Sequence, residues 1–106
     1  MTEKPNLSYI RQLSGGSAEF QERLLNVARR ELPEEIEVFK QSIQDSNYTE
    51  ASSNVHKLKH KISILGLEET YYFAEEYEDE LREGKNKRQA EFEEILQVML
   101  DFVQQS

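Results

Sequence analysis

A cluster of side chains that can act as nucleophiles, metal ligands or cations lies near the middle of the sequence. In the stretch "NVHKLKHKISILG", Asn54 to Gly66, two histidines and three lysines fall within six consecutive positions. They are His56, Lys57, Lys59, His60 and Lys61. A neutral imidazole is nucleophilic and basic near neutral pH, and an ammonium group attracts anions. The cluster therefore indicates chemistry on an anionic group, or a metal site built from the two imidazoles.

His56 is predicted to stand on the solvent side of a helix. At about 100° per residue, the apolar residues around Val55 fall within an arc of roughly 80°, and His56 lies outside that arc. The neighbours of His56 on the helix surface are Ser52, Ser53, Lys59, His60 and Ser63. Small hydroxyl residues leave an imidazole open to another macromolecule, and a lysine one turn away can neutralise an anion on its ring.

Three other interpretations of the cluster fit its residues less well. Runs of charge on a helix are usually solvated faces. His56 and His60 have the i, i+4 spacing of helical zinc sites, but the nearest acid on this helix is Glu50, and the three lysines repel a dication. A histidine-based hydrolase needs a carboxylate to orient the ring, and this helix offers none beside His56. We therefore predict no metal site and no hydrolase.

The elements that must position these residues are helices, because apolar residues recur at steps of three and four and no alternating pattern of useful length occurs. Predicted N-caps are Ser17 and Asn47, and Pro33 lies inside one long helix. The expected helices cover about residues 7–13, 18–43, 48–65, 67–83 and 86 onward. The last is expected to bury Ala90, Ile95, Val98, Met99 and Phe102. The predicted fold is all-α, an antiparallel four-helix bundle with a short extra N-terminal helix.

The composition narrows the function further. The 106 residues carry a formal net charge of -8, so nucleic acid and anionic membranes are poor partners. The chain has no cysteine, which excludes disulfides. No apolar run is long enough to span a bilayer and no signal-peptide pattern follows Met1, so a cytoplasmic protein is expected.

The histidine segment resembles the signature of the histidine-containing phosphotransfer (HPt) domains. In that signature the phospho-accepting histidine is followed by x-Leu-Lys-Gly and, further on, by a second Gly. His56, Leu58, Lys59 and Gly66 stand at the matching positions. The resemblance extends from "LSYIRQLSGG" through the active-site helix, about 48–65, to "GLEETYYFAEEYEDELREG". It leads us to expect a single HPt-like domain over residues 1–106.

What the resemblance implies is a phosphorelay intermediate without catalytic activity of its own. Such domains take a phosphoryl group from an aspartate of one receiver domain and pass it to an aspartate of another. By resemblance, His56 accepts the group on Nε2 and Lys59 steadies the phosphoryl oxygens. The receiver partner brings the acidic pocket and the Mg²⁺, so no cofactor of the chain's own is expected. The alternative is a non-phosphorylated helical module that docks a response-regulator-like partner.

The docking surface is expected around His56 on a monomeric protein. Its predicted residues are Ser52, Ser53, Lys57, His60 and Ser63, with Ile64 as a candidate apolar contact that can equally pack on the first helix. Lys57, Lys59 and Lys61 are expected to form a basic patch that complements the acidic rim of a receiver. His60 stands where the family usually has Gly, and its ring can narrow access to His56, hydrogen-bond it, or itself accept the phosphoryl group.

Overall fold

The computed structural model describes residues 3–106 and contains five helices and no strand in that range. The helices are α1 (Ser8–Ser14), α2 (Ala18–Gln44), α3 (Tyr48–Ile64), α4 (Glu68–Arg82) and α5 (Gln89–Gln105). The predicted all-α class is confirmed. Among the described residues, no helix combines the length and the apolar character that crossing a membrane requires.

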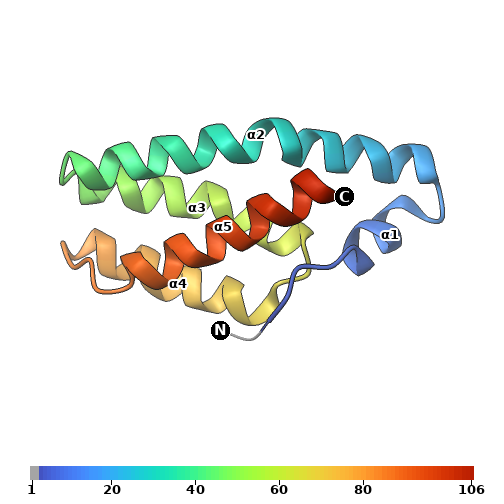
Figure 1. Cartoon of the computed structure of the whole chain (residues 1–106). Helices are drawn as coiled ribbons and strands as arrows, with labels where there is room; N and C mark the ends of the chain where they lie inside the picture. The colour runs from blue at the N-terminus through green and yellow to red at the C-terminus, as the bar shows by residue number, and fades with distance from the viewer. Residues whose placement is uncertain (1–2) are drawn as a thin grey trace.

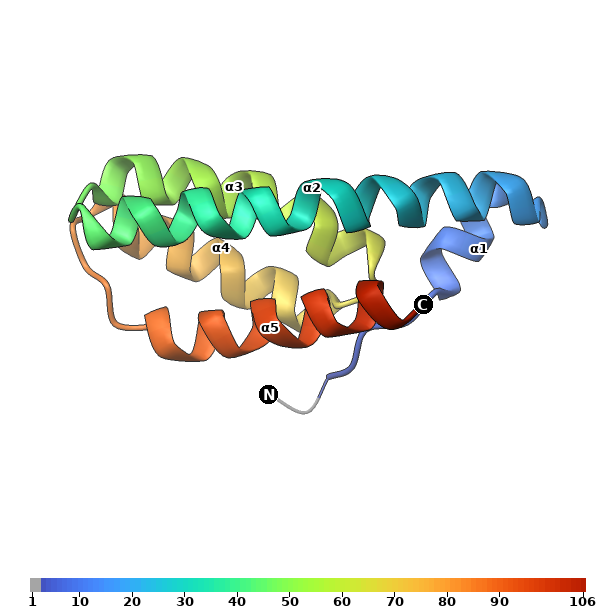
Figure 2. The same cartoon turned by 45° about the horizontal axis from the view of Figure 1, so that its top comes forward.

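The molecule is elongated, with extents of 43 × 23 × 18 Å along its principal axes. Four of its helices lie along the long axis (Figure 1). Figures 1 and 2 show that α2, α3, α4 and α5 lie along this axis and that each runs opposite to the one before it. α3 packs mainly against α4 and α2, and α5 packs against α2. The short α1 packs against the first part of α2, which extends beyond the other helices. α3 thus lies between two neighbours and keeps one face free.

The helix starts follow from local hydrogen bonds. The Ser17 hydroxyl accepts a hydrogen bond from the Phe20 amide at 3.2 Å, and the Asn47 side chain accepts one from the Glu50 amide at 3.1 Å. Each bond satisfies an amide that has no partner inside the helix. Both predicted N-caps are therefore confirmed. α2 is also one continuous helix through Pro33, as the unbroken apolar pattern predicted.

An aromatic cluster forms the centre of the core and joins three helices. The ring of Phe39 on α2 lies 6.1 Å from that of Tyr77 on α4 and 5.3 Å from that of Phe92 on α5, both edge to face. The Tyr77 hydroxyl donates a hydrogen bond of 2.6 Å to Asn86, and burial raises the pKa of this tyrosine. Asn86 therefore binds Tyr77 instead of starting the last helix, which begins at Gln89.

The buried face of α5 differs from the prediction. Ala90 and Val98 are exposed, whereas Ile95 and Met99 are buried as expected. The buried set on α5 is Phe92, Ile95, Leu96, Met99 and Val103. α5 is apolar on more than one side, so several stripes at helical spacing fit its sequence, and packing against Phe39 selects the one that contains Phe92.

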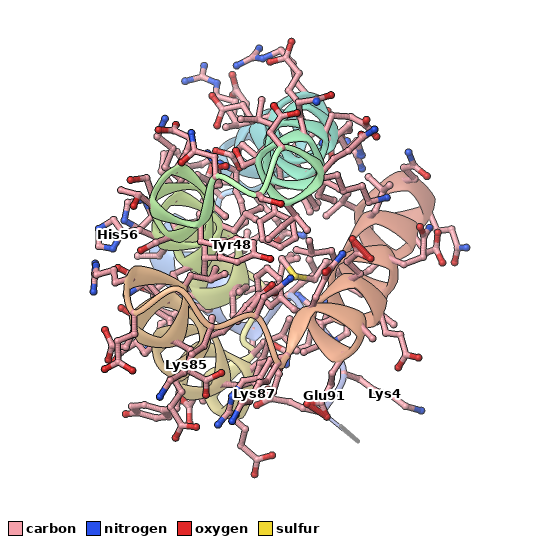
Figure 3. All side chains as sticks on the ribbon, turned by 90° about the vertical axis from the view of Figure 1, so that its left-hand side faces the viewer. Lys4, Tyr48, His56, Lys85, Lys87 and Glu91 are labelled. Carbon is pink, nitrogen blue, oxygen red and sulfur yellow. The ribbon has the colours of Figure 1, made fainter. Side chains whose placement is uncertain are left out.

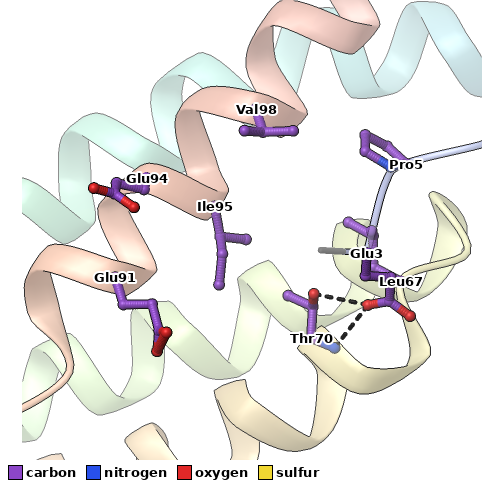
Figure 4. A pocket seen from close by; sticks show the side chains of 8 residues that line it. All are labelled: Glu3, Pro5, Leu67, Thr70, Glu91, Glu94, Ile95 and Val98. Atoms are coloured by element: carbon purple, nitrogen blue, oxygen red, sulfur yellow. Dashed lines mark hydrogen bonds between the residues drawn. The ribbon is translucent and has the colours of Figure 1, made fainter. Parts of the chain in front are cut away.

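The N-terminal segment is attached to the start of α4. The Glu3 carboxylate accepts hydrogen bonds from the Thr70 amide at 2.9 Å and the Thr70 hydroxyl at 2.8 Å (Figure 4). It also accepts one from the Glu69 amide at 3.0 Å. Burial alone raises the pKa of Glu3, but these hydrogen bonds outweigh it and lower the pKa below the ordinary value of 4.5. The segment covers a small cavity of about 90 Å³ between α4 and α5. Glu3 thus supplies the cap that the sequence of α4 lacks.

Candidate functional site

His56 projects from the free face of α3. Its side chain is 56% exposed, and Figure 3 shows it at the edge of the molecule, pointing away from the helices. The residue before it, Val55, is fully buried. The helical projection therefore predicted the orientation of both residues, since the apolar arc of α3 faces the core and His56 lies outside it.

One nitrogen of the His56 ring is held by a carboxylate of α4. Nδ1 lies 3.2 Å from Oε2 and 3.4 Å from Oε1 of Glu78, whose side chain is only 3% exposed. An ionised carboxylate can only accept hydrogen bonds, so Nδ1 must carry the hydrogen. The lone pair of the neutral ring is then on Nε2, the nitrogen remote from the backbone. This pairing fixes both the tautomer and the direction of the ring.

Glu78 is ionised because two cations surround it. Lys59 Nζ lies 2.9 Å from Oε1, and the guanidinium of Arg82 contacts Oε2. Burial alone raises the pKa of Glu78, but the Lys59 hydrogen bond and the charges of Lys59 and Arg82, with a smaller contribution from His56, outweigh it and lower the pKa below 4.5. Glu78 thus links His56 to two positive charges at the interface of α3 and α4.

Lys59 occupies a different place from the one expected. Its side chain is 10% exposed, and its Nζ lies between the carboxylate of Glu78 and the ring of Tyr71, 5.3 Å from the ring centre. Lys59 is therefore not an open cation on the surface of α3. It shares the carboxylate of Glu78 with His56.

The predicted basic patch of three lysines is wrong. Lys61 is buried on another side of α3, where its Nζ lies 2.9 Å from Glu31 and 3.2 Å from Glu35 of α2. Lys59 is buried against α4, as described above, so only Lys57 remains exposed. A projection of one helix cannot show this, because long lysine side chains reach carboxylates on neighbouring helices.

Most of the predicted docking residues lie on the open face beside His56. Ser53, Lys57, His60 and Ser63 are exposed. Ser52 is 3% exposed, so the expectation that it offers an open contact is wrong. The His60 ring lies 6.0 Å from the His56 ring, edge to face. Access to His56 from the C-terminal direction of α3 therefore passes the His60 ring.

The remaining predicted positions are structural. Leu58 is fully buried in the core. Gly66 follows the last turn of α3 with a φ of +75°, a conformation that favours glycine. Ile64 is half-buried at the end of α3, which limits its use as an exposed apolar contact.

A hollow opens on the other side of His56, toward the start of α3. Its lining residues are Thr49, Ser52, Ser53, His56, Lys57 and Arg82. Hydroxyl and cationic groups suit an anion. Among the described residues, no group of three or more potential histidine, cysteine or carboxylate ligands lies close enough together to hold a metal ion.

Glu78 and Arg82 are site residues that the sequence analysis missed. The sequence of α3 contains no carboxylate beside His56, and Glu78 comes from the next helix, α4. A signal was present in the pattern, because Glu78 stands four residues after Ala74 and three before Leu81, inside the apolar stripe of α4. A carboxylate at such a position is buried and requires a cationic or hydrogen-bonding partner.

Comparison with known proteins gives one family. A family model described as "Hpt domain" matches residues 23–106, which include α3, α4, α5 and most of α2. No curated protein and no solved structure matched the chain. The matched span contains His56, Glu78 and Arg82, so the whole site described above lies within it.

Proposed function

Because the chain belongs to the family of Hpt domains, the histidine-containing phosphotransfer domains of two-component systems, we propose that it is a phosphorelay intermediate that uses His56. His56 accepts a phosphoryl group from an aspartate of one receiver domain and passes it to an aspartate of another. The observation that carries this proposal is the exposed His56 ring whose Nδ1 faces the buried carboxylate of Glu78.

The transfer step follows from this geometry. The Nε2 lone pair attacks the phosphorus of the aspartyl phosphate, a P–N bond forms, and the P–O bond to the aspartate breaks. The electron pair of that bond stays on the aspartate carboxylate. The ring keeps its hydrogen on Nδ1 and becomes a cation, which the carboxylate of Glu78 stabilises. The reverse sequence hands the group to the next aspartate.

Glu78 also favours transfer in both directions. A ring held in one tautomer by a fixed carboxylate presents Nε2 without a search for the correct orientation. A phosphorylated ring that keeps its Nδ1 proton is cationic, and a cationic ring is the better leaving group. The protein therefore supplies a nucleophile and its orientation, while the receiver supplies the acidic pocket and the Mg²⁺. In this proposal the chain needs no cofactor and no catalytic activity of its own.

The docking surface is the free face of α3 around His56. Ser53, His60 and Ser63 share this face and leave space for a receiver beside the ring. Residues 1–106 act as one domain, in which α2–α5 form an antiparallel four-helix bundle and α1 covers one end. We propose a cytoplasmic monomer, because receivers of two-component systems act in the cytoplasm and the relay needs only one docking face.

Labelling by a receiver tests the proposal. A receiver domain phosphorylated on its aspartate should transfer its label to the wild-type protein, as acid-labile phosphate. His56→Gln should abolish the labelling and leave the melting temperature nearly unchanged, because an exposed side chain contributes little stability. Equal labelling of His56→Gln would reject His56 as the acceptor.

A second function is favoured by the position of His60. Its ring stands beside His56 where the family usually has Gly, which can hinder the approach of an aspartyl phosphate. The chain would then be a non-phosphorylated module that binds a response-regulator-like partner. In that case the wild type binds a receiver without being labelled, and His56→Gln binds it equally well.

A further inference from the structure

Lys59 is held by two different kinds of group from α4. Its Nζ lies 2.9 Å from Oε1 of Glu78 and 5.3 Å from the centre of the Tyr71 ring. Only 10% of the Lys59 side chain is exposed, so little water reaches the ammonium group. The face of an aromatic ring attracts a cation, and the attraction is stronger where water is excluded. The Tyr71 ring therefore replaces part of the hydration that Lys59 has lost.

Tyr71 and Glu78 belong to one face of α4. They are seven residues apart, which is about two helical turns, and Ala74 stands between them at steps of three and four. Ala74 is fully buried, and its side chain ends at Cβ. This face of α4 thus presents a ring, a short side chain and a carboxylate in that order. A long lysine side chain from α3 can therefore reach the ring and the carboxylate together.

The neutral ring leaves the charge of Lys59 to a single carboxylate. Lys61, which is also buried on α3, lies 2.9 Å from Glu31 and 3.2 Å from Glu35 and divides its charge between them. A tyrosine ring carries no negative charge, so it attracts the ammonium group without competing as a second carboxylate does. Lys59 is therefore bound to Glu78 alone, and the ring limits where its ammonium group can move.

The carboxylate of Glu78 transmits the position of Lys59 to the ring of His56. Lys59 binds Oε1, whereas Nδ1 of His56 lies nearest to Oε2, at 3.2 Å. A bond to one oxygen restricts the rotation of a carboxylate and so fixes the direction of the other oxygen. Arg82 also contacts Oε2, but its side chain is 57% exposed, and exposed ion pairs hold their partners weakly. Lys59 is thus the principal anchor of Glu78.

We propose that Tyr71 is a positioning residue of the phosphotransfer site. Its ring holds Lys59 against Glu78, and the fixed carboxylate keeps the hydrogen of the His56 ring on Nδ1 and the lone pair on Nε2. This inference rests on the proposed function, in which Nε2 must face the incoming phosphoryl group. Tyr71 acts through these two side chains and needs no contact with the phosphoryl group.

The tautomer of His56 tests the inference in the absence of any phosphoryl group. At pH 8 an imidazole is normally neutral, and its ¹⁵N signals show which nitrogen carries the hydrogen. In the wild type the hydrogen should be on Nδ1 in most molecules. Tyr71→Leu should give a mixture of the two tautomers, because Lys59 and Glu78 lose their fixed positions. Tyr71→Phe should keep the wild-type ratio, because the aromatic ring remains.

The rate of phosphoryl transfer is the second readout. Tyr71→Leu should accept label from a phosphorylated receiver about threefold more slowly than the wild type, which is the effect expected from one cation–aromatic contact. Tyr71→Phe should transfer at the wild-type rate. If Tyr71→Leu fails to fold, Tyr71→Met takes its place in both measurements, because a flexible methionine can fill the space of the ring.

Phe73→Leu is the matched control. Phe73 lies on the same helix, and its ring centre is 5.3 Å from the guanidinium carbon of Arg88, a different cation. Phe73→Leu should lower the urea midpoint and leave both the His56 tautomer and the transfer rate unchanged. A further measurement needs no variant: the ring current of Tyr71 should move the signals of the Lys59 methylene group next to Nζ upfield in the wild type.

Three results would overturn the inference. They are an unchanged tautomer ratio in the folded variant without the ring, a Tyr71→Phe variant that behaves like Tyr71→Leu, or Lys59 signals without an upfield shift in the wild type. The proposed function fails by a different result, which is the absence of transfer from a phosphorylated receiver to the wild type. Since the tautomer and the Lys59 signals are measured without a receiver, the two failures are distinguishable.

Discussion

Oε2 of Glu78 lies 3.2 Å from Nδ1 of His56, although the two residues are 22 positions apart in the chain. The same carboxylate binds Lys59 at 2.9 Å through its other oxygen. The ring of His56 is thus oriented by a buried ion pair between α3 and α4. This ion pair should therefore influence both the stability of the α3–α4 interface and the reactivity of the ring in the proposed function.

Glu78→Gln should reduce both transfer and stability. The neutral amide can still accept a hydrogen bond from Nδ1, but it no longer stabilises the cationic phosphorylated ring. We expect the rate of phosphoryl transfer to fall by about tenfold, the size of one hydrogen bond to a charged group. The free energy of unfolding should fall by about 3 kcal/mol because the buried Lys59 loses its partner. Transfer kinetics with a receiver and urea unfolding measure the two effects.

Glu75→Gln is the control for this substitution, since Glu75 is an exposed glutamate on the same helix. It should change neither the transfer rate nor the urea midpoint. A Glu78→Gln variant with wild-type transfer would show that the carboxylate charge plays no part in the reaction.

Acidic pH should destabilise the protein through Glu78 and Glu3. Both carboxyls have pKa values below 4.5 in the folded state, Glu78 through Lys59 and Arg82 and Glu3 through its hydrogen bonds at the start of α4. A lowered folded pKa gives stability that is fully present above the unfolded pKa and is lost as the pH falls through the folded pKa. Urea unfolding should therefore show constant stability from pH 7 to about 5 and a decline below about 4.5.

The double variant Glu3→Gln with Glu78→Gln identifies the source of this decline. Starting from a lower stability at pH 7, it should lose less on acidification than the wild type, because neither side chain can take up a proton. An equal loss in both proteins would assign the acid sensitivity to other carboxyls.

The side of α3 on which each residue lies could be predicted from the sequence. The side-chain contacts that residues of α3 make with other helices could not. The exposure of His56 and the burial of Leu58 follow from the angle of each residue on α3. The partners of Lys59 and Lys61 depend on which carboxylates α4 and α2 place opposite them, and one helix contains no information on that. The same reason hid Arg82, because its relation to His56 exists only after α3 and α4 have packed.

His60→Gly should lower the stability of the protein slightly without slowing the access of a receiver to His56. Glycine is less favourable than histidine inside a helix, by roughly 0.5 kcal/mol, so the variant should unfold at slightly lower urea. Its transfer rate should equal or exceed that of the wild type, because the ring that lies 6.0 Å from His56 is removed. The rate of transfer from a phosphorylated receiver can be measured in reactions that are quenched at short times.

Glu37→Gly is the matched control for the helix effect. Glu37 is exposed in the interior of α2, so its replacement should cost similar stability and leave transfer unchanged. A folded His60→Gly variant that transfers much more slowly would assign His60 a direct part in the reaction.

Gly66→Ala should destabilise the protein by more than its backbone conformation alone explains. Gly66 has a φ of +75°, and a Cβ at this position would lie 2.7 Å from Oδ1 of Asn6. Asn6 is itself engaged, because its amide donates to the Leu65 carbonyl at 2.9 Å and its side chain accepts from the Ser8 amide at 3.0 Å. The Asn6 side chain must therefore shift when the methyl group is added, and its hydrogen bond to the Ser8 amide is put at risk.

Gly84→Ala isolates the conformational part of this cost. Gly84 has a similar φ of +80° and no atom within 4 Å of an added Cβ, so its replacement should cost about 1 kcal/mol from the left-handed conformation alone. Gly66→Ala should cost clearly more in urea unfolding. Removing the obstructing side chain with Asn6→Ala should bring the additional cost of Gly66→Ala close to that of Gly84→Ala. If Gly66→Ala and Gly84→Ala destabilise the wild type equally, the Asn6 side chain moves aside at no measurable cost. The contact between Asn6 and position 66 then does not restrict the residue at that position.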